Sequence, residues 1–164
     1  MLGLCQWLQS TGFATYVRES LNLYPALYTL HIFGFVIMVT ATSALDLRVL
    51  GWALRESPVP GVYRRAIPWA KAGLAANLTT GFIVFAAQAV DMVTNTAFLL
   101  KMLMVLLAGV NIFVVKETAY KTVDQWGEKG EAPFAAKASA VISILLWFGI
   151  VAASRVIGFT GSRE

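Results

Sequence analysis

The feature that most constrains the fold of this chain is a long, uncharged apolar segment close to its N-terminus. Residues 21–45, LNLYPALYTLHIFGFVIMVTATSAL, contain no Asp, Glu, Lys or Arg. A helix of this length, rising about 1.5 Å per residue, can cross the roughly 30 Å hydrocarbon core of a bilayer. We therefore predict a transmembrane helix over these residues.

Three further apolar segments occupy much of the remaining chain, and we expect spans at about residues 69–92, 97–115 and 138–159. Charged residues make up 13% of the 164 residues, against roughly 25% in an ordinary soluble domain. The apolar runs are continuous and do not alternate, which favours helices over barrel strands. The sequence thus predicts one all-α domain, residues 1–164, folded as an integral membrane four-helix bundle.

The first 20 residues lack the basic start and the small-residue cleavage site of a secretory signal, so we expect them to be retained. Their apolar residues suit a short helix in the membrane interface, with an interruption at Gly12. Cys5 is the single cysteine. One cysteine excludes an intramolecular disulfide and a cysteine-based metal cluster, and we expect a free thiol.

The distribution of basic residues predicts the orientation of the spans. Of the 13 Lys and Arg, nine lie in or beside the connectors after the first and third spans: Arg48, Arg55, Arg64, Arg65, Lys71, Lys116, Lys121, Lys129 and Lys137. The other four are Arg18, Lys101, Arg155 and Arg163. Because basic loops stay in the cytoplasm, we expect a multi-pass protein of the bacterial inner membrane with both termini in the periplasm. The basic residues form no single patch or stripe, which argues against nucleic-acid binding.

The connectors and the span interiors give more local expectations. We expect the first connector to run from Asp46 to about Pro68, with Pro68 as a helix breaker and with Asp46 and Arg48 at the end of the first span. The short turn at Thr94 predicts that the middle two spans are antiparallel neighbours. Small and polar residues fall close to one line of the second span, as the inner face of a bundle requires: Gly73, Asn77, Thr80, Gly81 and Gln88.

The candidate site is a set of ionisable residues in the outer half of the bundle. His31, the only histidine, lies about ten residues, roughly 15 Å, below the outer end of the first span. Lys101 and Arg155 enter the third and fourth spans from the same side, and Asp91 closes the second. One interpretation is purely structural: the two cations reach the headgroups with Asp91 as a partner, and His31 bonds a carbonyl, a tyrosine such as Tyr28, or Gln88.

The alternative interpretation is a cofactor site formed by His31, Lys101, Arg155, Tyr28 and Gln88. Imidazole is a common iron ligand, so His31 is a candidate axial ligand of haem b, with Lys101 and Arg155 holding the propionates. A quinone, a lipid or a proton relay are further candidates for the same residues. The chain has no second histidine. Bis-histidine ligation within one chain is therefore excluded.

Several segments taken together resemble an uncharacterised family of small bacterial inner-membrane proteins with four spans. They are LHIFGFVIMVTATSALDLRVLG, PWAKAG, TTGFIVFAAQA, NTAFLLKMLMVLLAGVN and LLWFGIVAASRVIGF, between about Trp7 and Phe159. The resemblance implies an inner-membrane bundle and carries no established activity or cofactor. Relatives often have a histidine near the end of the third span, where this chain reads NIFVVK, residues 111–116. This departure argues further against haem ligation within one chain.

Three functions compete on this sequence. There is no phosphate-binding loop, metal cluster or nucleophilic triad, so we expect a non-catalytic subunit that packs with other membrane subunits or with its own copies in a larger complex, respiratory or photosynthetic. The first alternative is a haem b electron-transfer protein with His31 as axial ligand. The second is a small transporter or ion pathway, for which four spans are few.

Overall fold

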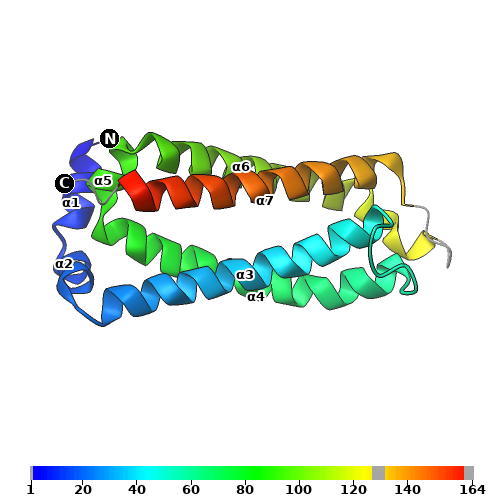
Figure 1. Ribbon diagram of the computed structural model, residues 1–164, viewed down its shortest axis with the longest axis horizontal. Coiled ribbons are helices and arrows are strands. Elements are labelled where there is room, and N and C mark those ends of the chain that lie inside the picture. Colours follow the sequence, from blue (N-terminus) through cyan, green and yellow to red (C-terminus); the bar gives the residue numbers. More distant parts are fainter. Residues whose placement is uncertain (1, 127–131, 161–164) are drawn as a thin grey trace.

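The computed structural model describes residues 2–126 and 132–160, and every regular element within them is a helix. The elements are α1 (Leu2–Gln9), α2 (Gly12–Glu19), α3 (Leu23–Val49), α4 (Val59–Ala87), α5 (Ala89–Thr94), α6 (Thr96–Glu117), the 3₁₀ helix η1 (Tyr120–Gln125) and α7 (Phe134–Thr160). The four long helices form an elongated bundle (Figure 1). The predicted all-α bundle is confirmed. Lys129 and Arg163, which contribute to the expected orientation, lie outside the described residues.

Helices α3, α4, α6 and α7 are each long and apolar enough to cross a membrane. Only 11% to 28% of the most apolar window of each helix is buried inside the protein. A helix that exposes apolar residues on most of its surface is stable in lipid and unstable in water. The protein is therefore a multi-pass membrane protein whose outer faces contact acyl chains.

The helix that contains the second span begins earlier than we expected. Helix α4 starts at Val59, after Pro58 as N-cap and with Pro60 in the first turn, and it continues through Pro68. A proline in the first turn removes only an N–H that the helix leaves unpaired, so Pro60 starts the helix and does not break it. Pro68 lies in the helix interior on an exposed position. Membrane helices commonly contain such a proline, because neighbouring groups hydrogen-bond the backbone carbonyl that it leaves free. The expectation that Pro68 ends the connector is wrong.

The bundle consists of two helix pairs, α3 with α4 and α6 with α7, which lie in two layers (Figure 1). Helices α3 and α4 approach most closely at two glycines: a Cβ atom added to Gly73 would lie 2.7 Å from both the Gly34 oxygen and the Met38 nitrogen. Because small residues let membrane helices pack backbone against backbone, this contact sets the α3–α4 crossing.

The middle two spans, α4 and α6, are not the closely packed pair that the short turn suggested. The Phe85 ring of α4 and the Phe98 ring of α6 stack at a centroid distance of 5.7 Å beside α5. Helix α4 otherwise packs mainly on α3, while α6 packs mainly on α7. The short helix α5 separates the ends of α4 and α6. The two helices therefore do not pack closely, although only a few residues connect them.

Two clusters of buried apolar residues hold the pairs together. One lies in the middle of the bundle and contains Met38, Ala108, Trp147 and Ile150. The other lies at the end formed by η1 and the connectors, which we call the η1 end, and it draws residues from α3, α4, α6, η1 and α7. We call the opposite end of the bundle the α5 end (Figure 1).

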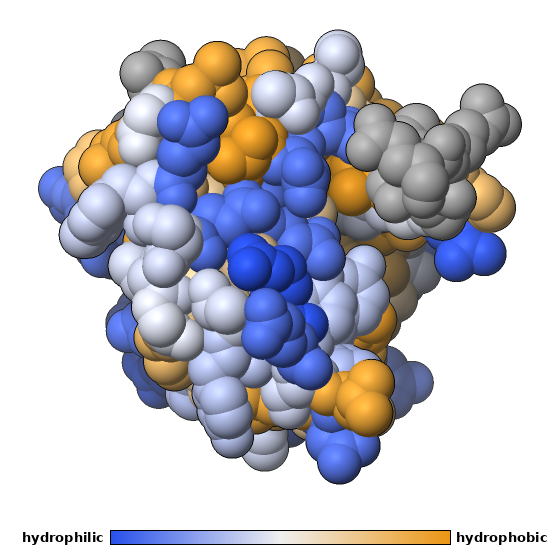
Figure 2. Space-filling view, turned by 90° about the vertical axis from the view of Figure 1, so that its left-hand side faces the viewer, coloured by the Kyte–Doolittle hydropathy of each residue, from blue (hydrophilic) through white to orange (hydrophobic). Residues whose placement is uncertain are grey.

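The N-terminal residues form two short helices, with the interruption that we expected at Gly12 lying at residues 10 and 11. Thr11 caps α2 by accepting a hydrogen bond from the Ala14 N–H, and Gly12 is its first residue. Gln9 Oε1 accepts from the Val90 N–H at 2.8 Å, and Arg18 donates to the Ala87 carbonyl at 3.3 Å. Both helices thus pack across the α5 end, where Figure 2 shows a hydrophilic centre beside apolar patches.

Candidate functional site

The site in the outer half of the bundle is built around His31, whose ring is held between α3 and α4. His31 Nδ1 lies 3.1 Å from the Thr80 hydroxyl oxygen, and the Asn77 amide donates to the His31 backbone carbonyl at 3.0 Å. A Cβ atom added to Gly81 would lie 2.9 Å from His31 Cε1. Thr80 and Gly81 of α4 therefore border the ring, and Asn77 holds the backbone of His31. Apart from Gln88, the inner face expected for the second span faces α3.

The hydrogen bonds around Thr80 determine which nitrogen of neutral His31 carries its proton. The Thr80 hydroxyl donates to the Ala76 carbonyl at 2.6 Å, in the i−4 geometry common for threonine in helices. Its proton is thus used, and toward His31 the hydroxyl can only accept. The His31 Nδ1–H is therefore the donor, and the Nε2 lone pair of the neutral ring is left to accept a proton or to bind a metal.

A substitution at Thr80 tests this arrangement. Thr80→Val keeps the volume of the side chain and removes the acceptor, so the partly buried Nδ1–H of His31 loses its partner. We expect the free energy of unfolding to fall by about 1 to 3 kcal/mol. Thr79→Val, on the exposed neighbouring position of α4, is the matched control and should change stability by less than about 0.5 kcal/mol. Denaturation of both variants in the same detergent measures the difference, and equal stabilities would contradict the assignment of Thr80 as acceptor.

Lys101 of α6 is the cation whose charge acts on His31. It is half-buried, and its charge acts electrostatically on the imidazole. Within the described part of the chain Lys101 makes no ion pair with an acidic side chain. Asp91, which we expected as a partner for Lys101 or Arg155, is exposed on α5 and pairs with neither. Lys101 thus has no counter-charge from residues 2–126 or 132–160.

Tyr28 and Arg155 meet in a separate pocket at the α5 end of the interface between α3 and α7. This open pocket has a volume of about 130 Å³ and is lined by Tyr28, Ser154, Arg155, Gly158 and Phe159. The Arg155 guanidinium lies 5.0 Å from the centroid of the Phe159 ring, a cation–π contact. Tyr28 stacks on Tyr24, and its hydroxyl is not the partner of His31. The pocket is small compared with the several hundred cubic ångströms of a typical cofactor site.

Gln88 does not join these residues, because α4 ends at Ala87 and Gln88 separates it from α5. Its backbone has φ −137° and ψ 37°, outside the helical region. Ala87 and Ala89 on either side are fully buried beneath the N-terminal helices. The candidate site residues therefore fall into three places: His31 with Lys101, Tyr28 with Arg155, and Gln88 at the helix break.

Sequence analysis missed a second polar cluster, at the η1 end. Asp46 of α3 is only 7% exposed, and the buried Ser143 of α7 is its polar neighbour. Asp46 Oδ2 is buried without a hydrogen-bond partner in the described part of the chain. Arg48, two residues later and 6% exposed, donates from Nε to the Ser57 carbonyl and so fastens the first connector to α3. Asp46 and Arg48 do not form an ion pair with each other.

Aromatic residues of η1 and α4 cover this cluster. The Tyr120 ring lies 4.9 Å from the Tyr63 ring and 5.5 Å from the Trp126 ring, measured between centroids. Burial of the phenol, followed by the negative charge of Asp46 and by Tyr63, raises the pKa of Tyr120 well above its usual value of 10.0. The phenol of Tyr120 thus lies within electrostatic range of the Asp46 carboxyl.

This pKa predicts a loss of stability in alkaline solution. Above pH 10 the unfolded chain releases the Tyr120 proton while the folded protein retains it, so the free energy of unfolding falls as the pH rises. We expect Tyr120→Phe to make this decline shallower, and Tyr16→Phe, at an exposed position of α2, to leave it unchanged. Denaturation on either side of pH 10 measures both slopes. A slope in Tyr120→Phe as steep as that of the unchanged protein would contradict the prediction.

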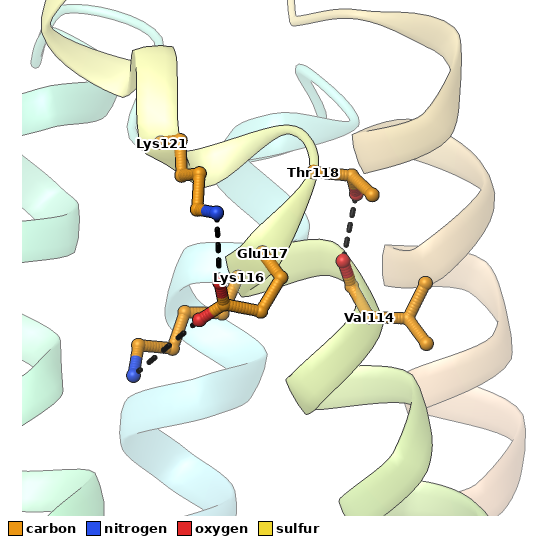
Figure 3. Close-up of polar contacts among 5 residues, drawn as sticks. All are labelled: Val114, Lys116, Glu117, Thr118 and Lys121. Atoms are coloured by element: carbon orange, nitrogen blue, oxygen red, sulfur yellow. Dashed lines mark hydrogen bonds and ion pairs between the residues drawn. The ribbon is translucent and has the colours of Figure 1, made fainter.

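The end of α6 places η1 over this cluster. Lys121 forms an ion pair with Glu117 at 2.8 Å, Lys116 lies 4.0 Å from the same carboxylate, and the Thr118 hydroxyl donates to the Val114 carbonyl at 2.7 Å (Figure 3). Exposed ion pairs of this kind contribute little to the free energy of unfolding. The position of η1 therefore depends mainly on its buried apolar residues.

The described residues contain no group of three or more His, Cys, Asp or Glu side chains that could hold a metal ion. No curated protein and no solved structure matches the chain. A model of a protein family of unknown function, DUF6644, matches residues 5–160, which is nearly the whole sequence. The four-span chain with a histidine held between its first two spanning helices thus belongs to the DUF6644 family.

Proposed function

We propose that this protein is a non-catalytic integral membrane subunit that packs with other subunits, or with further copies of itself, in a larger membrane complex. The observation that carries the proposal is Lys101, a half-buried cation in a spanning helix without an acidic partner in the described part of the chain. It lies five residues, or roughly 7.5 Å, along α6 from Thr96. A cation inside the bilayer is costly unless it finds a partner.

A partner subunit supplies what Lys101 lacks. An acidic side chain on a neighbouring spanning helix would pair with Lys101 and reduce this cost, which reaches about 2.5 to 3.5 kcal/mol for a lysine at the bilayer centre and is smaller near the end of a helix. The largely exposed apolar surface of α6, on which only Ala108 and Val115 are buried, offers the area for such a helix. Electron-transfer complexes of respiration or photosynthesis are the class of assembly that we propose.

The mass of the purified particle tests this proposal. The protein is extracted from native membranes in a mild detergent, and light scattering gives the protein mass while mass spectrometry identifies copurifying chains. We expect a mass well above the 17.8 kDa of one chain. Lys101→Met should lower that mass, and Lys137→Met, at an exposed position of α7 near the η1 end, should not. A particle that is monomeric before any substitution would contradict the proposal.

The proposed location in the cell is argued from the distribution of the basic residues. We propose the inner membrane of a bacterium, with both termini in the periplasm, because nine of the 13 basic residues lie, along the sequence, in or beside the connectors after the first and third spans. On this orientation the α5 end faces the periplasm and η1 faces the cytoplasm.

A haem b electron-transfer protein is the second candidate, and the tautomer of His31 favours it. A metal-bound histidine usually donates its other N–H to a hydrogen-bond acceptor, which is the role of Thr80 here. The chain offers one axial ligand, so the iron would take its other ligand from a second copy or a partner subunit. Oxidised and reduced absorbance spectra test this: a Soret band lost in His31→Ala supports haem, and a native preparation without that band excludes it.

A further inference from the structure

Arg155 supplies the positive charge of the small pocket between α3 and α7. Within residues 2–126 and 132–160 no carboxylate forms an ion pair with this arginine. Its guanidinium contacts the Phe159 ring, and a ring face has no lone pairs that could accept the guanidinium N–H groups as an anion does. Arg155 can therefore bind an anion that comes from outside the chain.

The pocket beside Arg155 has room for one small polar group. Its volume is about 130 Å³, more than the roughly 10 to 15 Å³ that one water molecule requires and less than the roughly 300 to 1,000 Å³ of sites for drug-sized ligands. A Cβ atom added to Gly158, which lines the pocket, would have no atom within 4 Å, so the space beside this glycine is open. The size suits the phosphate of a lipid headgroup and excludes a large cofactor ring.

The hydroxyl groups of the pocket differ in what they can offer a ligand. Ser154 donates its proton to the Ile150 carbonyl at 2.7 Å, so toward the pocket its oxygen can only accept. On the α3 side, Tyr28 stacks on Tyr24 at a centroid distance of 6.4 Å, and its phenol can donate. The pocket thus combines two donors for an anion, Arg155 and Tyr28, with one acceptor for a neighbouring hydroxyl group.

The pocket lies at the depth of lipid headgroups. Helices α3 and α7 have 27 residues each, roughly 40 Å, so in a hydrocarbon core of about 30 Å they extend about 5 Å beyond each side. Tyr28 lies about 7.5 Å along α3 from Leu23, and Arg155 lies the same distance along α7 from Thr160. Both are therefore near the edge of the hydrocarbon core, from which an arginine side chain reaches the phosphates.

An apolar surface continues from the pocket toward the middle of the bilayer. Val151 and Phe148 precede Arg155 by four and seven residues, so the three lie on one face of α7. Val151 is 51% exposed and Phe148 is 73% exposed. A lipid whose phosphate contacts Arg155 can therefore place an acyl chain along these two residues.

We propose that Arg155, Tyr28 and Ser154 form a specific binding site for one anionic phospholipid of the phosphatidylglycerol type. The single negative charge of its phosphate matches the single guanidinium, and a hydroxyl group of its glycerol headgroup donates to Ser154. Phosphatidylcholine has no headgroup hydroxyl, and its positive charge is repelled by Arg155. The headgroup therefore determines which lipid occupies the pocket.

Native mass spectrometry of the purified protein, titrated in detergent with short-chain lipids, counts the lipids bound per chain. We expect one phosphatidylglycerol per chain, bound at least about tenfold more tightly than phosphatidylcholine. Arg155→Gln should raise the Kd for phosphatidylglycerol about 10- to 100-fold, because a hydrogen bond to a charged group is lost. Arg65→Gln, which removes the same charge from an exposed position of α4 outside the pocket, should leave this Kd unchanged.

Two further variants test the pocket without removing its charge. Gly158→Leu fills the open space and keeps Arg155, so it should also weaken binding of phosphatidylglycerol, and it decides the question if Arg155→Gln does not fold. Phosphatidylmethanol carries the same charge as phosphatidylglycerol but has no headgroup hydroxyl. It should bind the unchanged protein about two- to tenfold more weakly than phosphatidylglycerol, and Ser154→Ala should abolish this difference.

Four results would overturn the proposal. They are equal affinities for phosphatidylglycerol and phosphatidylcholine, equal Kd values in Arg155→Gln and Arg65→Gln, a difference from phosphatidylmethanol that persists in Ser154→Ala, and displacement of the lipid by millimolar inorganic phosphate. The last result would assign the pocket to a free anion. Binding is counted per chain, so the outcome does not depend on the mass of the particle, which tests the proposed subunit role.

Discussion

Gly73→Ala is expected to lower the free energy of unfolding by about 3 kcal/mol, at the upper end of the range for overpacked interiors. The added methyl group would lie 2.7 Å from the Gly34 oxygen and from the Met38 nitrogen, and both are backbone atoms that no rotamer change can move away. The helices α3 and α4 must therefore separate. Since Gly81 and His31 meet on the same interface, we also expect the environment of His31 to change.

Gly109→Ala is the matched control, because an added Cβ on this exposed glycine of α6 has no atom within 4 Å. Alanine is the better helix former, so this variant should be as stable as the unchanged protein or more stable by up to about 1 kcal/mol. Unfolding of both variants in one detergent, followed by circular dichroism, gives the comparison. Equal stabilities of the two variants would show that the α3–α4 contact is looser than described.

The second large effect is expected for Arg48→Ala, at about 2 to 3 kcal/mol. The Arg48 side chain is 6% exposed and donates to the Ser57 carbonyl, so its removal leaves a carbonyl without its charged donor and opens a space in the η1 end. The first connector should then become accessible to proteases near Ser57. Release of the connector is the specific consequence, because the helices themselves do not depend on this bond.

Arg65→Ala serves as the control for this prediction. Arg65 is an exposed residue of α4 on the same side of the bundle, and its truncation should cost less than about 0.5 kcal/mol. Limited proteolysis in nanodiscs, read by mass spectrometry, locates the cleavage. If Arg48→Ala and Arg65→Ala are cut at the same rate, the role assigned to Arg48 is wrong.

The features set by hydropathy could be predicted from the sequence. Four long apolar segments give four long helices, and the small residues of the second span face a neighbouring helix, because bilayer thickness and close packing leave few alternatives. Helix ends are less constrained by hydropathy. Pro68 illustrates this: proline is a breaker on average, but a helix that starts at Val59 carries it on an exposed position.

The sequence could not predict which helices pack against each other or which groups each polar side chain bonds. The break at Gln88 depends on Gln9 and Arg18, which reach it from helices more than 60 residues away in sequence. Thr80 is one of several hydroxyls that could have reached His31. Asp46 and Arg48 are close in sequence and oppositely charged, yet two residues apart on a helix they point in different directions. Each of these outcomes is decided by tertiary packing.

The central claim is that four helices of this chain cross the bilayer, and single-cysteine labelling tests it most directly. In a Cys5→Ser background, Ser10→Cys, Glu56→Cys, Thr94→Cys and Gln125→Cys each place one thiol on an exposed position outside the long helices. A membrane-impermeant maleimide added to sealed vesicles should label positions 10 and 94 from one side and positions 56 and 125 from the other. Labelling of two consecutive positions in this series from the same side would contradict the four-span structure.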